Sequence, residues 1–239
     1  MSVSGEGGGT SATLGGSALG RVYSDVEAYY GARVTKYGAT PLGVDWSCQA
    51  TQSLRFVQLL KICDFSAPFA LNDVGCGYGA LAAFLAMRHP KSKIDYLGVD
   101  LSRAMISRAR RRFQSLDRRF VIGKASPRVA DYSVASGIMN VNVGYSRAVW
   151  EDFVATMLRD MRRTSRRGFS ANFMADTTEA RTSVDSPAAS LYRTSPQPWV
   201  RYCERDLGCS VETIDNYGMK EFTLLVRCNR VFADPYCRH

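Results

Sequence analysis

Three glycines at alternate positions constrain the fold of this 239-residue chain more than any other feature. Gly75, Gly77 and Gly79 follow a short apolar run that ends in Asp73, and they precede the helix-favouring segment 80–86. This order predicts a strand, a tight turn and the start of a helix. Residues without a Cβ let a ligand lie against the main chain, and the first N–H groups of the helix point at whatever occupies the turn. The segment therefore predicts a site for a nucleoside-bearing small molecule.

A second segment, residues 94–102, indicates how such a molecule could be held. It is typical of a following strand that ends in Asp100, with Ser102 as the cap of the next helix. A carboxylate at the tip of such a strand can accept both hydroxyls of a ribose, although it could also serve as a solvated helix-capping acid. Gly75, Gly77 and Ala80 also satisfy the loose dinucleotide pattern G-x-G-x-x-G/A, so the glycines by themselves leave a nicotinamide cofactor open.

Alternating strand and helix patterns predict an α/β fold with a doubly wound, mostly parallel sheet. Two apolar segments near the end of the chain are separated by a turn at 215–218, which predicts an antiparallel C-terminal hairpin and a sheet of seven strands. Expected helices cover 51–64, 80–89, a segment after Ser102 and 150–163; expected strands cover 69–74, 94–99, 119–122, 132–138, 168–173, 210–214 and 221–227.

The segment Asp73–Gly79 reads D-V-G-C-G-Y-G and resembles the first motif of class I S-adenosylmethionine-dependent methyltransferases. The C-terminal hairpin belongs to the same Rossmann-like methyltransferase fold, and dinucleotide domains lack it. The resemblance covers most of 51–227 and implies S-adenosylmethionine as cofactor. It implies that the glycine turn faces the methionine part and that Asp73 contacts the cofactor, although Asp73 could equally hold the turn together. The cofactor-binding residues that it implies are Asp73, Gly75, Cys76, Gly77, Asp100, Leu101, Lys124, Ala125 and Ser136.

The chain departs from the family pattern after its third strand. Members of the family commonly carry an acid there that meets the adenine amine, whereas this chain has Lys124. An ammonium cannot accept a hydrogen bond, so we expect backbone groups of Lys124 and Ala125 to contact the adenine. The N-P-P-Y and D-P-P-Y signatures are absent after the fourth strand. Asn140 is a candidate there for orienting the methyl acceptor, or else a residue of the strand-end turn.

The segment before the first strand supplies the remaining candidates. Residues 29–33, 43–46 and 52–55 resemble the cap of an uncharacterised bacterial group of such enzymes, of the small-molecule type. Because the only histidines are His89 and His239, which are not expected in the site, a general base would come from a carboxylate or a tyrosine. We expect Trp46 to wall the pocket and Arg33 or Arg55 to meet the methionine carboxylate, unless they serve packing or the surface. The catalytic candidates besides Asn140 are Tyr29, Tyr30, Tyr37 and Asp45.

The charge of the chain leaves its acceptor open. The net charge of +9 comes from arginines clustered at 103–119 and 159–167. Such runs are usually solvated helix faces, but they can attract RNA or an acidic substrate. The leading hypothesis is methyl transfer to an O, N or C nucleophile of a small-molecule acceptor. The alternatives are an RNA methyltransferase and a nicotinamide-dependent oxidoreductase.

Composition also predicts domains and compartment. We expect a Gly/Ser-rich disordered tail at 1–20, a helical cap at 21–66, the methyltransferase domain at 67–230 and a tail at 231–239. Seven cysteines without a C-x-x-C pair predict reduced thiols, no metal site and a cytoplasmic location, and neither a signal peptide nor a membrane span is expected. The polar connection 176–198 is either a surface excursion or a lid. Oligomeric state cannot be inferred from the sequence.

Overall fold

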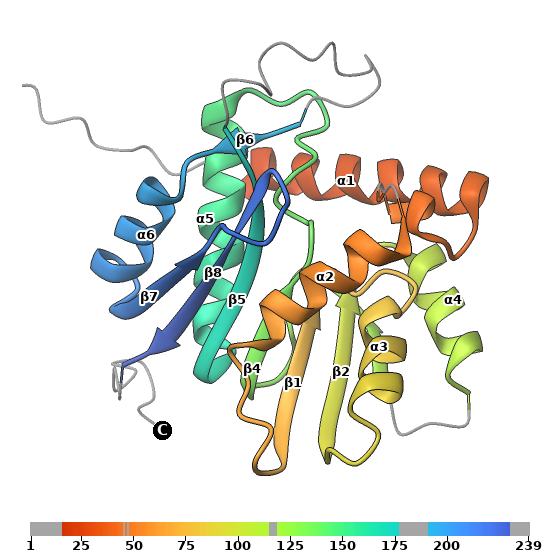
Figure 1. Cartoon of the computed structure of the whole chain (residues 1–239). Coiled ribbons are helices and arrows are strands. Elements are labelled where there is room, and N and C mark those ends of the chain that lie inside the picture. The colour runs from red at the N-terminus through yellow and green to blue at the C-terminus, as the bar shows by residue number, and fades with distance from the viewer. Residues whose placement is uncertain (1–15, 45, 47, 115–118, 177–190, 230–239) are drawn as a thin grey trace, which may run out of the picture.

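The computed structural model describes residues 16–44, 46, 48–114, 119–176 and 191–229, which form a twisted sheet flanked by helices (Figure 1). The helices are α1 (Gly16–Tyr37), the 3-10 helix η1 (Pro41–Val44), α2 (Gln49–Leu60), α3 (Ala80–Arg88), α4 (Arg103–Arg112), α5 (Arg147–Arg163) and α6 (Pro196–Arg205). The strands are β1 (Phe69–Val74), β2 (Ile94–Asp100), β3 (Arg119–Ile122), β4 (Ala130–Ala135), β5 (Ser165–Ala175), β6 (Arg193–Thr194), β7 (Cys209–Ile214) and β8 (Glu221–Cys228).

The order of the strands confirms the predicted fold class. It is β3-β2-β1-β4-β5-β8-β7, and the short β6 pairs with β5 beside this path. The pairs among β1 to β5 are parallel, whereas β8 is antiparallel to both β5 and β7. The predicted C-terminal hairpin is therefore present, and its second strand lies between β5 and the edge strand β7. The sheet is doubly wound and mostly parallel, as expected.

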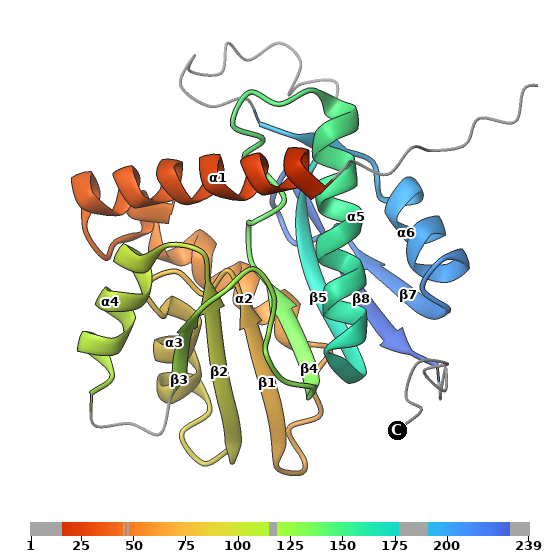
Figure 2. The ribbon, with the colours of Figure 1, turned by 180° about the vertical axis from the view of Figure 1, so that it is seen from behind.

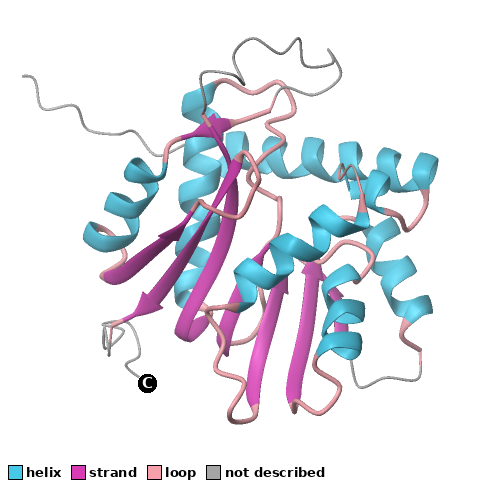
Figure 3. Cartoon of the chain, in the orientation of Figure 1, coloured by secondary structure: helices cyan, strands magenta, loops and turns pink. Residues whose placement is uncertain are grey.

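Helices cover both faces of the sheet and bury two apolar clusters (Figures 2 and 3). One cluster joins α2, α3 and α4 to the sheet, with Leu59, Leu81 and Ile106 in its centre. The other joins α1, α5 and α6 to the opposite face and contains the fully buried Trp150. No helix follows β3: residues 123–129 return directly to β4. Among the described residues, no helix has the length and apolar character needed to cross a bilayer.

Strand bounds agree closely with prediction where the apolar runs are short and well delimited. β1 and β3 have the expected bounds, whereas β4 ends at Ala135 and not at the expected residue 138. The difference arises at Gly137, whose φ of 79° turns the chain away from the sheet. The helix expected at 51–64 begins at Gln49 and ends at Leu60. Cys48 is its N-cap, and the Thr51 hydroxyl donates to the Cys48 carbonyl oxygen at 3.0 Å.

Two predictions about segments outside the sheet need correction. α1 begins at Gly16, so residues 16–20, which were assigned to the disordered tail, are helical. Residues 1–15 and 230–239 lie outside the described residues, as does the part of the 176–198 connection at 177–190. The rest of that connection contains β6 and the start of α6, neither of which the polar composition suggested. Pro196 at the first turn of α6 suits a helix start, because that position needs no N–H donor.

Candidate active site

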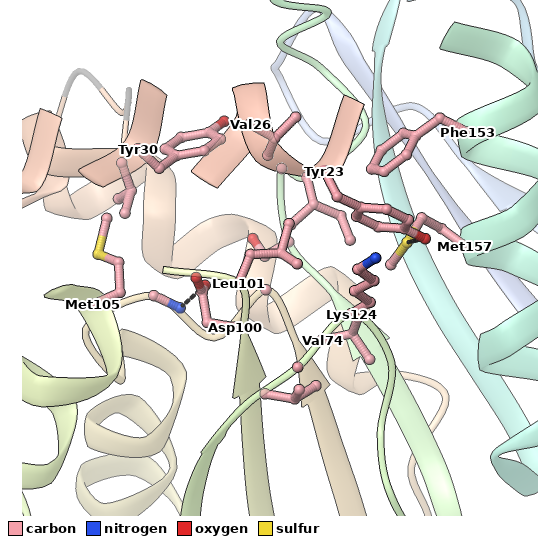
Figure 4. A pocket seen from close by; sticks show the side chains of 18 of the residues that line it. Tyr23, Val26, Tyr30, Val74, Asp100, Leu101, Met105, Lys124, Phe153 and Met157 are labelled. Atoms are coloured by element: carbon pink, nitrogen blue, oxygen red, sulfur yellow. Dashed lines mark hydrogen bonds between the residues drawn. The ribbon is translucent and has the colours of Figure 1, made fainter. Parts of the chain in front are cut away.

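A pocket lies at the carboxyl ends of the central strands, beneath α1 (Figure 4). It holds about 690 Å³ of empty space, part of it open to solvent. Its floor comes from the ends of β1 and β2 and from the turns that follow β3 and β4, and its roof comes from α1 and α5. This position agrees with the rule that open α/β sheets bind ligands outside the carboxyl ends of their strands. A smaller pocket on the other side of the glycine turn shares Trp46, Gly75, Gly77 and Ser136 with it.

The glycine turn lies at the junction of the two pockets. The N–H groups of Gly75 and Cys76 both donate to the Val99 carbonyl oxygen, at 2.8 and 3.1 Å, which ties the turn to the end of β2. Gly75 has a φ of 74°, and a Cβ there would lie 2.1 Å from a methyl carbon of Ile138. Any other residue type would displace the Ile138 side chain and strain the backbone at this positive φ. Cys76 lines only the smaller pocket, and burial raises the pKa of its thiol well above the usual value.

Asp100 lies at the tip of β2 and borders the larger pocket, as the sequence predicted. One carboxylate oxygen accepts the Gly77 N–H and the other accepts the Ser102 N–H, each at 2.8 Å. Burial raises the pKa of Asp100 to about 6, against the lowering effect of these two hydrogen bonds. Since a carboxylate offers about four lone-pair sites, both oxygens retain the capacity to accept further donors. Leu101, also predicted, lines the same pocket.

Asp73 lies on the other side of the turn and borders the smaller pocket. It is 2% exposed, and its carboxylate accepts the Tyr96 hydroxyl at 2.5 Å. Burial raises its pKa to about 7, the Tyr96 hydrogen bond opposes this shift, and the nearby Asp100 carboxylate adds to it. Ser136 borders both pockets, and its buried hydroxyl has no hydrogen-bond partner among the described residues. The junction thus presents a carboxyl group and an unsatisfied hydroxyl to any ligand that spans it.

Lys124 enters the larger pocket, whereas its neighbour Ala125 does not. The Lys124 ammonium lies 4.7 Å from the centre of the Tyr23 ring, and the Tyr23 hydroxyl donates to the Met157 sulfur at 3.7 Å (Figure 4). Burial raises the pKa of Tyr23 to about 12. Ala125 borders a separate surface groove with Arg128, and the predicted contact of Ala125 with the cofactor is therefore not supported.

Sequence reasoning named only one of the residues through which α1 lines the pocket. Tyr23, Val26 and Tyr30 line it at positions i, i+3 and i+7, which is the spacing of one helix face. The sequence predicted a helical cap at 21–66 and named Tyr30 as a candidate, but it did not single out Tyr23 and Val26, which lie on the same helix face. Phe153 and Met157 of α5 complete the roof. The sequence predicted the helix that carries these two residues but assigned neither to a site.

Trp46 walls both pockets, as predicted, while Arg55 has another role. The Arg55 guanidinium stacks on the Trp46 ring at 3.6 Å and forms a two-pronged ion pair with Glu221 of β8, with Arg55 Nε 2.7 Å from a Glu221 oxygen. Glu221 also accepts from the Asn172 amide at 3.2 Å, and the Asn172 oxygen accepts the Gly137 N–H at 2.8 Å. Arg55 lines neither pocket and is 5% exposed, so it supports the pocket wall from behind.

Apart from Tyr30, the other candidates from the segment before β1 lie outside the two pockets or outside the described residues. Arg33 donates to the Leu42 carbonyl oxygen at 2.9 Å, and this hydrogen bond joins α1 to η1. The Arg33 guanidinium also packs on the Tyr37 ring. Tyr29 packs edge-on against Tyr30, and of these two only Tyr30 lines the pocket. Asp45 is not among the described residues.

Asn140 is 2% exposed and holds the strand-end turn together. Its side-chain oxygen accepts the Met174 N–H at 3.1 Å, and its carbonyl oxygen accepts the Tyr192 N–H at 2.7 Å. Because Asn140 lines neither pocket, the turn role considered for it in the sequence is the one that the contacts support. His89, as expected, is remote from the site and stacks on Phe65 at the far end of α3.

Comparison with known proteins assigns the family. Residues 72–168 match the model of a methyltransferase domain. The chain is 37% identical over 169 residues to the "Putative methyltransferase Rv1506c" of Mycobacterium tuberculosis, covering 70% of this chain and 98% of that protein. The chain therefore belongs to the class I S-adenosylmethionine-dependent methyltransferases, which removes the nicotinamide-dependent alternative.

Solved structures share the fold at low sequence identity. Magnesium protoporphyrin IX methyltransferase from Synechocystis, with bound S-adenosylhomocysteine, superposes with a TM-score of 0.53 at 14% identity, covering 89% of this chain and 94% of that one. Phosphoethanolamine N-methyltransferase 1 of Haemonchus contortus gives a TM-score of 0.61 at 14% identity, covering 90% of this chain and 50% of the other. At these identities the similarity supports the fold but does not identify the methyl acceptor.

Proposed function

We propose that this methyltransferase transfers a methyl group in line to an O, N or C nucleophile of a small molecule held beneath α1. The observation that carries the proposal is the convergence of the glycine turn and Asp100 on one pocket. The roof of that pocket is apolar and aromatic, built from Tyr23, Val26 and Phe153. A concave, mostly apolar pocket with a few polar groups is typical of sites for small ligands.

The residues present fit S-adenosylmethionine. Asp100 has the remaining acceptor capacity to receive the ribose hydroxyls, and backbone groups at Gly75, Cys76 and Gly77 would hold the methionine part. The unpartnered Ser136 hydroxyl also supports a polar ligand at the junction of the pockets. Asp73, bordering the smaller pocket, would face the cofactor's amine. Leu101 and Lys124 would border the adenine, whereas the positions of Ala125, Arg33 and Arg55 do not support direct contact.

The chain's own contribution to the reaction is alignment and exclusion of water. When bound, the cofactor supplies a methyl group already activated on a sulfonium, so most of the barrier reduction comes from orientation. Trp46 and the turn after β4 form the wall along which the acceptor would lie, and α1 closes the pocket from above. Tyr23 keeps its proton at neutral pH because its pKa is about 12. It can therefore donate a hydrogen bond, but it is a poor general base.

Calorimetry with S-adenosylhomocysteine tests the cofactor site. We expect binding in the micromolar range, the usual order for such sites, and at least about tenfold weaker binding for Asp100→Ala. Asp95→Ala is a matched control, because Asp95 lies at the opposite end of the same strand and pairs with Arg119 and Arg128. If Asp100→Ala does not fold, Asp100→Asn replaces it. Wild-type affinity in the folded Asp100 variant would overturn the proposed site.

A transfer assay tests the acceptor class. Tritiated S-adenosylmethionine is incubated with the enzyme and with extract fractions that separate small metabolites, RNA and protein. Label confined to small metabolites supports the proposal. Label in RNA would favour the alternative acceptor, which the basic groove at Arg128, Arg159, Arg162 and Arg163 keeps open. RNA binding should then weaken steeply as salt is raised.

A further inference from the structure

Two cysteines lie opposite each other at the open end of the C-terminal hairpin. Cys209 is the first residue of β7 and Cys228 the last of β8, and the two are direct cross-strand partners. Directly opposed residues on antiparallel strands have Cα atoms about 4.5 to 5.5 Å apart, which falls within the range of about 4.4 to 6.8 Å that a disulfide spans. Both are free thiols here, and no other described strands pair cysteine with cysteine.

The surroundings of the pair favour reaction at Cys209. The neighbouring Cys228 thiol lowers the pKa of the Cys209 thiol to about 7, burial opposes this, and the Arg162 guanidinium lowers it further. Arg162 is itself held in place by a hydrogen bond to the Leu207 carbonyl oxygen at 3.3 Å. By contrast, burial raises the pKa of both Cys63 and Cys203 to about 12. Thiolate character determines which cysteine attacks a disulfide.

Access is compatible with a small oxidant. Cys209 is buried at 4% exposure, but Cys228 is only partly buried and ends the strand at the surface. The pair also lies at the end of β8 opposite to Glu221, which supports the active-site wall. Chemistry at the cysteines therefore does not require any active-site group.

We propose that Cys209 and Cys228 form a reversible dithiol–disulfide site that reacts with low-molecular-weight disulfides. The Cys209 thiolate attacks a sulfur of the small disulfide, which forms a mixed disulfide and releases one small thiolate. The Cys228 thiol then loses its proton to solvent, and its sulfur attacks Cys209, which closes the protein disulfide and releases the second small thiolate. The two protein thiols are thereby oxidised by two electrons, and one small disulfide is reduced to two thiols. The product joins β7 to β8 covalently at the open end of the hairpin.

Oxidised glutathione and peptide mapping of the full chain test the proposal. Trypsin cleavage places Cys209 in peptide 206–220 and Cys228 in peptide 228–230. We expect these peptides to become joined, with a mass about 2 Da below their sum and with release by dithiothreitol. We also expect the oxidised protein to melt about 5 °C higher, since a cross-link restricts the unfolded chain. The joined pair should form faster as the pH rises through 7.

Two variants separate this site from other thiol chemistry. Cys228→Ala should stop at the mixed disulfide on Cys209, with the pH midpoint of that step moved upward because the lowering influence of the neighbouring thiol is lost. Cys203→Ala is the matched control, since it removes a neighbouring buried cysteine of α6 and should leave the joined peptides unchanged. The proposal is overturned if glutathione modifies only the exposed Cys48, if Cys209 joins Cys203, or if Cys209 and Cys228 stay reduced in the wild type.

Discussion

The buried ion pair between Arg55 and Glu221 provides the sharpest test of how the pocket wall is supported. Arg55 is 5% and Glu221 2% exposed, and two guanidinium nitrogens meet the two carboxylate oxygens. Glu221→Gln keeps the shape of the side chain but leaves the Arg55 charge buried without a counter-charge. Breaking a buried pair in this way costs about 3 to 5 kcal/mol. For a chain of this length we expect Tm to fall by about 10 °C.

Urea unfolding of a small set of variants measures the effect. Asp64→Asn is the control, since Asp64 and Arg167 form an ion pair in which both side chains are nearly half exposed. Its loss should cost far less than that of the buried pair, because solvent screens exposed pairs. The double variant Arg55→Met/Glu221→Leu removes both charges and should recover most of the stability lost in Glu221→Gln. It should not recover the wall of the pocket, because Asn172 loses its acceptor and Trp46 loses its stacked guanidinium.

Two results would refute this reasoning. If Glu221→Gln costs no more than Asp64→Asn, then the Arg55 charge is not desolvated as its low exposure indicates. If the double variant is as unstable as Glu221→Gln, then the loss comes from packing and not from an uncompensated charge.

Three further predictions concern the site itself. Gly137 has a φ of 79°, and a Cβ on it would lie 2.1 Å from the Trp46 ring. Gly137→Ala should therefore lower the free energy of unfolding by about 1 to 3 kcal/mol and alter Trp fluorescence, and an unchanged spectrum and stability would contradict this packing. Because the folded-state pKa of Asp73 is raised to about 7, the free energy of unfolding should fall by up to about 4 kcal/mol as pH rises from 4 to 8. In urea titrations at several pH values, Asp73→Asn should flatten this dependence on pH, and the same dependence in the variant and the wild type would count against the raised pKa. Tyr23→Ala removes part of the pocket roof and should weaken S-adenosylhomocysteine binding about tenfold by calorimetry, whereas Tyr23→Phe, which keeps the ring, should bind within about twofold of wild type.

The sequence predicted the elements whose bounds are set by residues close to one another along the chain. The bounds of β1 and β3 followed from short apolar runs, and Ser102 caps α4 as expected, with its hydroxyl accepting the Met105 N–H. The glycine turn and Asp100 are neighbours in space because parallel strands end at the same edge of the sheet. Their juxtaposition was therefore readable from the order of strands and helices alone.

Long-range pairing explains what the sequence could not indicate. Arg55 looked free to meet a carboxylate of the cofactor, because nothing near it in sequence identifies Glu221, which lies 166 residues further on, as its partner. Ala125 follows Lys124 directly, yet the two face different cavities because the chain leaves β3 without a helix. Neither the partner of a buried charge nor the direction of a side chain in an irregular crossover has a local signature.

These contacts bear on the division of the chain into a cap at 21–66 and a catalytic domain at 67–230. Val22 and Val26 of α1 belong to the same apolar cluster as Trp150 of α5, and α2 is joined to β8 by the Arg55–Glu221 pair. Separate domains have their own cores and exchange few contacts, whereas here the proposed cap shares both its apolar cluster and its buried charge with the sheet. We infer that residues 21–66 fold together with the sheet, and that the pocket is complete only when they do.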